Sequence, residues 1–391
     1  MTFDFAAPSS ILFGPGCVSR VGAAALALDP ARKRAFVVTG RDASRAAPVF
    51  ASLDAAGLVH DQFALGREPR FEDAREALEL ARASGCALLL GFGGGSAIDL
   101  AKALAALLAN PGDPMDYAEV IGGGKSLERP SLPCIAIPTT AGTGSEATRN
   151  AVLASGEHGV KVSLRSPTML PRVAIVDPEL ARDLPPRLTA ETGMDALTQL
   201  IEPFVCSTPG PLVDAICREA LPRALRSLPR AFREGGDLSA REDMAFASLS
   251  GGLALANARL GAVHGLAGPL GGFLPIPHGA ACAALLGPAA RANVRALRER
   301  EPEHPALARY AEAASLAGGS PPNDRSWRPE DAAVTFGVLA AELGVRGLAF
   351  FGLNRKDFPG LIEKAQASSS MRGNPILLSR EELQAILEEA L

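Results

Sequence analysis

Residues 86–108 read CALLLGFGGGSAIDLAKALAALL, an apolar run that breaks into glycines and then resumes as an Ala- and Leu-rich segment. The apolar run predicts a buried strand, and residues 97–108 predict a helix. Glycines at this junction let backbone N–H groups approach an anion, and a helix N-terminus favours negative charge. We therefore predict a phosphate site here, with a ligand-free strand-to-helix turn as the alternative.

The same alternation of strand and helix runs through the first half of the chain. Strands are predicted at ILFGPG (11–16), RAFVVTG (34–40), DQFALG (61–66) and LPCIAIP (132–138), and helices over 18–28, 43–56 and 71–84. This order indicates an α/β domain with a doubly wound parallel sheet. After about Pro185 strand signals nearly vanish. We therefore expect a dinucleotide-binding α/β domain over 1–184 and an all-helical metal and substrate domain over 185–391.

A second polar loop, PTTAGTGSE, follows the strand that ends at Pro138. It offers hydroxyl groups that can bind a polar ligand, those of Thr139, Thr140, Thr143 and Ser145. The alternative is a hydroxyl-rich turn that caps the next helix. Two such loops at the carboxyl edge of adjacent parallel strands form the crevice where ligands usually bind.

Four residues of the second half are candidate metal ligands. Asp195 and Gln199 lie four apart in TGMDALTQLIE and share a helix face, whereas His264 and His278 lie in Gly- and Pro-rich sequence. A carboxylate and two imidazoles suit Fe²⁺ or Zn²⁺, and the Gln199 amide would be a weak fourth ligand. The alternative is that both His residues are hydrogen-bonded core residues.

Composition excludes several classes of function. The formal net charge is −4 without a long basic run, so nucleic-acid binding is not expected. The N-terminus shows no secretory signal, and the charge-free stretch 260–290 holds His, Pro and Gly residues that favour buried helices over a membrane span. Six cysteines without framework spacing indicate reduced thiols in a cytoplasmic protein.

Together these motifs resemble the iron-containing (group III) alcohol dehydrogenase family, which has the dehydroquinate synthase-like fold. GGGSAIDLAK, PTTAGTGSEAT, TGMDALTQLIE and both His segments are similar to family motifs in the family's order, over essentially the whole chain. The resemblance implies a nucleotide-binding domain, a helical domain, a cleft between them and a homodimer. It also implies hydride transfer between NAD(P)(H) and an alcohol, aldehyde or oxo-acid carbon.

The resemblance assigns roles residue by residue. Asp195, His264 and His278 fall on metal-ligand positions, with Gln199 at the fourth. For the cofactor, the motif match assigns Gly94, Gly95 and Ser96 to the pyrophosphate, Thr139, Thr140 and Thr143 to the nucleotide pocket, and Lys161 to the ribose region. We add four neighbouring residues as candidates for cofactor binding: Gly40, Arg41, Asp99 and Ser145.

Three departures from the family pattern matter. Gln199 replaces a His, and the loss of that imidazole would weaken metal binding or change which metal binds. Maleylacetate reductase-like relatives imply that the reaction can proceed without a metal, in which case His264 or His278 would donate the proton. Gly268 replaces a candidate relay His. Gly40 replaces the Asp of NAD-preferring members, so we favour NADP(H) with Arg41 on the 2′-phosphate, although the neighbouring Asp42 argues for NAD.

Other functions remain open on the sequence alone. One is a lyase of the dehydroquinate synthase type, and another is a nucleotide-binding protein that has lost catalysis. Arg149, after the second loop, would favour an anionic substrate such as an oxo acid unless it pairs with Glu146 or Glu191.

Overall fold

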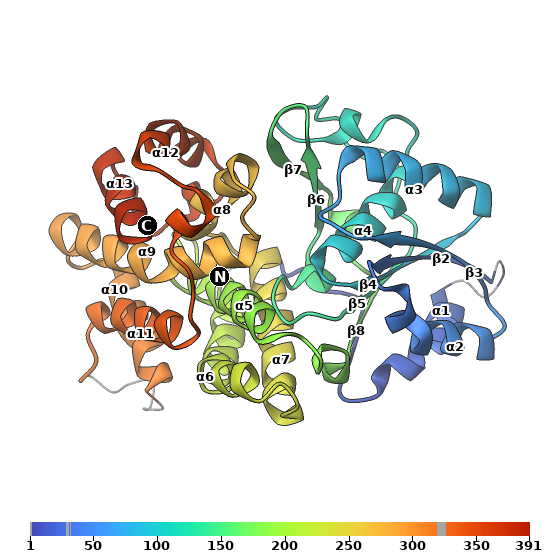
Figure 1. Cartoon of the computed structure of the whole chain (residues 1–391), viewed down its shortest axis with the longest axis horizontal. Helices are drawn as coiled ribbons and strands as arrows, with labels where there is room; N and C mark the ends of the chain where they lie inside the picture. Colours follow the sequence, from blue (N-terminus) through green and yellow to red (C-terminus); the bar gives the residue numbers. More distant parts are fainter. Residues whose placement is uncertain (1, 29–30, 32, 319–325) are drawn as a thin grey trace. The chain divides into compact units, whose positions relative to one another are not determined.

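The computed structural model describes residues 2–28, 31, 33–318 and 326–391. The chain forms two compact units (Figure 1), one over Ala6–Arg182 and one over Asp183–Leu391 together with the N-terminal residues up to Phe5.

The first unit is built on a six-stranded sheet in which every pairing is parallel. The strands in spatial order are β1 (Ser10–Phe13), β8 (Val173–Val176), β5 (Cys134–Pro138), β4 (Leu88–Gly93), β2 (Arg34–Gly40) and β3 (Val59–Leu65). The predicted parallel sheet is confirmed. Every residue of β4 is buried, which explains its continuous apolar sequence.

Helices cover both faces of this sheet (Figure 1) because successive strand residues point to opposite sides. Ala35 and Val37 of β2 pack in one apolar cluster, and Phe36 and Val38 in the other. The first cluster includes α1 (Val21–Leu28) and α2 (Ala47–Ala55), and the second includes α3 (Phe71–Ser84) and α4 (Gly95–Ala109). Short 3₁₀ turns precede α1 and α2, where continuous helices were expected.

The strand order reverses between β2 and β4. From β2 the chain moves outward to β3, whereas from β4 it moves the opposite way to β5 and β8. Gly40 ends β2 and Gly93 ends β4, and a Cβ on Gly93 would lie 3.3 Å from the Gly40 nitrogen and 2.9 Å from the Ala97 side chain. Glycine is therefore required at this reversal, where doubly wound sheets bind their ligands.

An antiparallel hairpin that the sequence analysis did not predict follows the second polar loop. It consists of β6 (Asn150–Ser155) and β7 (Val160–Arg165). Alternate residues of β6 are buried, and Ala151 and Leu153 join the core beneath α3 and α4. The sequence of β6, NAVLAS, hides this alternate burial because residues 151–154 are all apolar, so the apolar/polar alternation of a half-buried strand is missing.

The second unit is helical, as predicted. Its helices are α5 (Pro186–Val205), α6 (Pro211–Arg233), α7 (Leu238–Asn257), α8 (Ala262–Phe273), α9 (His278–Arg300), α10 (Pro305–Ala317), α11 (Pro329–Glu342), α12 (Phe358–Ala367) and α13 (Arg380–Glu389). Residues 193–205 of α5 are all buried, and α5 packs against α6, α7 and α9. Within the described ranges, no helix is both long and apolar enough to cross a membrane.

A buried lysine fixes the second polar loop to α4. Lys102 is fully buried, and its ammonium donates to the Ser145 carbonyl and the Thr148 hydroxyl, both at 2.9 Å, and lies 3.0 Å from Asp99 Oδ1. All three ammonium hydrogens therefore have acceptors. Removing the charge would leave Asp99 without its cationic partner inside the protein.

We predict that Lys102→Met lowers the free energy of unfolding by about 3 kcal/mol, because it leaves the Asp99 carboxylate inside the protein without a cationic partner. The matched control is Lys125→Met, since Lys125 is exposed and pairs with Asp116 at 3.3 Å on the surface. That change should cost less than about 1 kcal/mol. Urea unfolding of both variants tests this, and equal losses would contradict the role given to Lys102.

Candidate functional site

The first glycine loop and the second polar loop pack side by side. Gly94 precedes α4, and no side chain of the described residues caps that helix. A Cβ on Gly94 would lie 3.4 Å from Thr140 Cγ2, and one on Gly95 would lie 2.8 Å from Thr143 Oγ1. The Thr139 N–H donates to the Gly93 carbonyl at 2.8 Å. The structure thus brings the predicted phosphate residues together at the start of α4, with Gly94, Gly95 and Ser96 partly exposed.

Three other predicted cofactor residues make contacts within the protein. Asp99 Oδ1 accepts from the Ser145 hydroxyl, and Oδ2 accepts from the Val152 N–H at 2.9 Å. Lys161 on β7 pairs with Glu68 at 2.7 Å. These contacts give Asp99 and Ser145 a structural role in joining α4 to the second loop. Their contact with a cofactor, and that of Lys161, stays a prediction.

The segment after β2 carries an exposed arginine, Arg41. Arg41 Nη2 donates to the Gly66 carbonyl at 2.9 Å, and its side chain lies on the surface beside the carboxyl end of the sheet. Asp42 Oδ1 instead accepts from the hydroxyl and N–H of Ser44, at 2.6 and 3.1 Å, and these bonds lower the pKa of Asp42. The Asp42 carboxylate, which favoured NAD in the sequence, therefore caps the turn that begins at Ala43.

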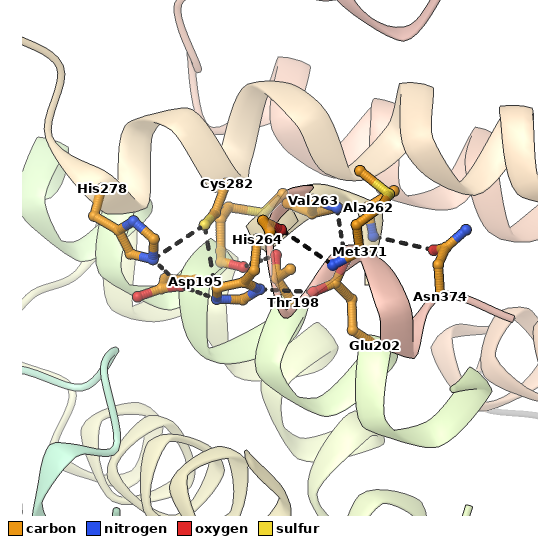
Figure 2. Close-up of polar contacts among 12 residues, drawn as sticks. Asp195, Thr198, Glu202, Ala262, Val263, His264, His278, Cys282, Met371 and Asn374 are labelled. Carbon is orange, nitrogen blue, oxygen red and sulfur yellow. Dashed lines mark hydrogen bonds and ion pairs between the residues drawn. The ribbon is translucent and has the colours of Figure 1, made fainter. Parts of the chain in front are cut away.

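A four-residue polar cluster lies in the helical unit (Figure 2). It comprises Asp195 of α5, His264 of α8, and His278 and Cys282 of α9, and one ligand atom from each lies within 4.8 Å of the others. His264 Nε2 and His278 Nε2 are 3.4 and 3.9 Å from Asp195 Oδ1. The structure therefore brings together the predicted Asp195, His264 and His278, which are up to 83 positions apart (278 − 195).

Close helix packing assembles this cluster. A Cβ on Gly279 would collide with the Glu191 carbonyl of α5, so glycine lets the first turn of α9 approach that helix. A Cβ on Gly251 of α7 would lie 3.0 Å from Gln199 Cβ. These two glycines allow neighbouring helices to approach α5 on either side of the Asp195 turn.

Glu202, two turns after Asp195 on α5, orients His264. Its Oε2 lies 2.7 Å from His264 Nδ1, and its Oε1 accepts from the Val263 N–H at 2.7 Å (Figure 2). We assign the Nδ1 hydrogen to this contact, which leaves the Nε2 lone pair facing the cluster. A carboxylate that holds a ligating imidazole in this way is the usual outer partner of a metal-bound His.

The cluster attracts positive charge. Burial lowers the pKa of His264, but Cys282, Asp195 and Glu202 outweigh it and raise that pKa well above its usual value. The pKa of His278 is also raised, chiefly by Cys282 and against burial. Burial raises the pKa of Asp195, yet the two imidazoles dominate and lower it. A site that stabilises protonated imidazoles around a carboxylate favours cations in general.

Two buried acceptors in this region remain without a hydrogen-bond partner among the described residues. They are Asp195 Oδ1 and Gln199 Oε1, on residues that are 2% and 3% exposed. An unpaired buried acceptor is costly, and a bound cation would satisfy the carboxylate oxygen. The donor set of one carboxylate, two imidazoles and one thiol therefore fits a divalent transition metal.

Sequence reasoning missed three residues of this region. Glu202 lies seven positions after Asp195, a helical spacing that the sequence shows. Cys282 lies four positions after His278, a spacing that is informative only once His278 is known to begin a helix. Asn374 comes from the C-terminal segment and accepts from the Ala262 N–H at 3.0 Å, so it fixes the start of α8. No local pattern links Asn374 to this helix.

Arg149 does not pair with Glu146 of its own unit, and a pairing with Glu191, which belongs to the other unit, stays a prediction. Glu191 pairs with Arg187 at 2.8 Å, and both carboxylate oxygens of Glu146 are buried without a hydrogen-bond partner among the described residues. Burial raises the pKa of Glu146 to about 7. Within the α/β unit, Arg149 forms no ion pair with a described residue.

We predict that Glu202→Gln weakens Zn²⁺ binding by about 10- to 100-fold, the usual effect of losing an outer carboxylate partner. The control is Glu191→Gln on the same helix, which removes only a pairing with exposed Arg187. Competition with a chromophoric chelator measures both affinities. Indistinguishable affinities in the two variants would argue against the orienting role of Glu202.

Comparisons with known proteins cover the whole chain. The sequence model of "Iron-containing alcohol dehydrogenase" matches residues 8–178, and that of "Fe-containing alcohol dehydrogenase family, C-terminal" matches 189–391. The 1,3-propanediol dehydrogenase of Klebsiella pneumoniae is 35% identical over 99% of this chain and 98% of that protein.

Two solved structures have the same fold. A 1,3-propanediol oxidoreductase is similar at a TM-score of 0.90 and 34% identity, over 100% of both chains. The sulfoacetaldehyde reductase of Bifidobacterium kashiwanohense in complex with NAD⁺ is similar at a TM-score of 0.85 and 29% identity, over 100% of this chain and 99% of that one. The chain therefore belongs to the iron-containing alcohol dehydrogenase family and is an oxidoreductase that acts on alcohols or aldehydes.

Proposed function

We propose that this protein transfers a hydride between C4 of the nicotinamide of NAD(P)(H) and the carbon of a small alcohol or aldehyde, with a divalent metal held by Asp195, His264 and His278. The observation that carries the proposal is the buried cluster of these three side chains, in which one oxygen of Asp195 has no hydrogen-bond partner among the described residues. Family membership supports the reaction class.

The dinucleotide is proposed to bind at the glycine loop. Gly94, Gly95 and Ser96 present the uncapped start of α4, where backbone N–H groups bind a pyrophosphate. Thr140 and Thr143 pack against these glycines and would line the nucleotide pocket. Support comes from the position of this loop beside the reversal of strand order and from the NAD⁺ complex of a relative.

Within the helical unit each residue has a distinct task. When bound, a divalent metal polarises the substrate oxygen as a Lewis acid. Asp195 supplies negative charge from α5, and Glu202 keeps His264 Nε2 directed at the cluster. The side chain of His278 is 38% exposed, so it is the imidazole of the cluster that substrate can reach.

A metal-independent reductase of an anionic oxo acid is the second candidate. Gln199 lacks the imidazole of the family pattern, and the positive charge of Arg149 would suit a carboxylate substrate. In that reaction His278 would donate the proton to the carbonyl oxygen. The relay position offers no substitute, because Gly268 carries no side chain and faces open space. A cytoplasmic homodimer remains part of the proposal.

Metal removal is the direct test of the metal-assisted reaction. We expect protein purified without chelator to contain metal and to oxidise NADH or NADPH with some of a panel of aldehydes and oxo acids. Stripping the metal should lower kcat/KM by more than about 100-fold, since Lewis-acid stabilisation is worth several kcal/mol. Adding Zn²⁺ or Fe²⁺ back should restore activity.

Each other outcome selects a different function. Full activity in metal-free protein would contradict the Lewis-acid role and favour the oxo-acid reductase. Cofactor binding without turnover would indicate a binding protein. Phosphate release from a phosphorylated sugar acid would indicate a lyase of the dehydroquinate synthase type.

Cofactor choice is tested at Arg41. If its guanidinium pairs with the 2′-phosphate, Arg41→Ala should lower kcat/KM for NADPH by about 10- to 100-fold, the worth of a charge-assisted hydrogen bond. The value for NADH should stay within about 2-fold, because NADH lacks that phosphate. Equal losses with both cofactors would contradict the assignment, and Arg45→Ala, on the following turn and bonded to the Leu180 carbonyl, is the control.

A further inference from the structure

We propose that Cys282 is the fourth metal ligand of this protein and takes the place of the imidazole that is missing at position 199. The resulting site of one carboxylate, two imidazoles and one thiolate would bind Zn²⁺ in strong preference to Fe²⁺. The inference rests on the proposed function in one respect, that a divalent metal binds at this cluster.

Position on the helix brings Cys282 to the cluster. It follows His278 by four residues on α9, so the two side chains share a face. Cys282 is fully buried, and its Sγ lies 3.6 Å from His278 Nε2 and 4.0 Å from His264 Nε2. Figure 2 shows its sulfur directed at both imidazole rings.

The unpartnered carboxylate oxygen points to a ligand independently of the cysteine. Asp195 Oδ1 is buried and has no hydrogen-bond partner among the described residues, yet it lies 3.4 and 3.9 Å from the two Nε2 atoms. A tetrahedral zinc ion with bonds of about 2.0–2.3 Å separates its ligand atoms by about 3.3–3.6 Å. Four of the spacings are 3.4 to 4.0 Å, and all four ligand atoms lie within 4.8 Å of one another, so the side chains would contract by up to about 1 Å onto one ion.

Gln199 is the weaker candidate for the fourth position. Its amide oxygen is neutral, and a Cβ on Gly251 of α7 would lie 3.5 Å from it, so the amide packs towards that helix. The thiolate is a stronger zinc ligand than an amide. The other five cysteines belong to no group of three or more potential ligands within the described ranges.

A thiolate changes what the site selects. One carboxylate and one thiolate would neutralise the two charges of a divalent ion, whereas a carboxylate with three neutral imidazoles leaves one positive charge. Thiolate is a soft ligand and is well suited to zinc, while Fe²⁺ binds more weakly to comparable donor sets. Cys282 is thus inferred to set the metal preference of this chain.

Cobalt substitution tests the proposal without reference to activity. Chelator-stripped wild-type protein titrated with Co²⁺ should gain a thiolate-to-cobalt charge-transfer band in the near ultraviolet. Cys282→Ser should lose that band and bind Zn²⁺ more than about 100-fold more weakly, beyond the effect of losing an outer-shell partner. Its Zn²⁺ to Fe²⁺ affinity ratio should also fall.

Matched variants separate the possible outcomes. Cys206→Ser, a buried cysteine of the same unit outside the cluster, should keep the band, and so should Gln199→Ala. Wild-type protein that binds Co²⁺ without the band, or Cys282→Ser with unchanged Zn²⁺ affinity, would overturn this inference and leave the metal-assisted reaction standing. Wild-type protein that binds no metal would overturn both. The charge-transfer band is measured on wild-type protein, so this part of the test does not depend on whether any variant folds.

Discussion

The burial of the Asp195 carboxylate governs the architecture of the helical unit. A carboxylate withdrawn from water is costly unless opposite charge and hydrogen bonds surround it. Here the protein brings two imidazoles to within 4 Å and leaves one oxygen free of hydrogen bonds from the described residues. Such an arrangement is poor as a structural core and well suited to a cation. The glycines that admit neighbouring helices, the Glu202 contact and the Asn374 contact all serve to hold it.

In the α/β unit, the junction between β4 and α4 is shaped so that backbone N–H groups can approach an anion. Gly93, Gly94 and Gly95 keep side chains out of the junction between β4 and α4, and the neighbouring threonines occupy the space that side chains would fill. Lys102 then anchors the second loop from below by hydrogen bonds to its backbone and to Thr148. Because the Lys102 ammonium is already bound to Asp99, Ser145 and Thr148, anion binding at the junction depends on backbone N–H groups and on exposed Arg41.

Periodicity in the sequence predicted the parallel sheet, the helical second unit and α3 to the residue, since each has a long apolar pattern. The hairpin β6–β7 was not predicted because residues 151–154 of β6 are all apolar, so the sequence does not alternate although the burial does. Asp195 and the two His were candidates from their chemistry, and the family resemblance assigned them to metal-ligand positions. Cys282 was not, because its spacing from His278 has meaning only once His278 is known to begin a helix. Asn374 depends on a contact 112 positions away, which no local pattern encodes.

The central claim is that one divalent ion is bound by Asp195, His264 and His278. Anomalous diffraction at the zinc absorption edge, from crystals of protein loaded with one equivalent of Zn²⁺, tests it most directly. The account predicts a single strong peak at about 2.0–2.2 Å from Asp195 Oδ1 and from Nε2 of both imidazoles. A peak elsewhere, or none, with the three side chains in their present positions would contradict it.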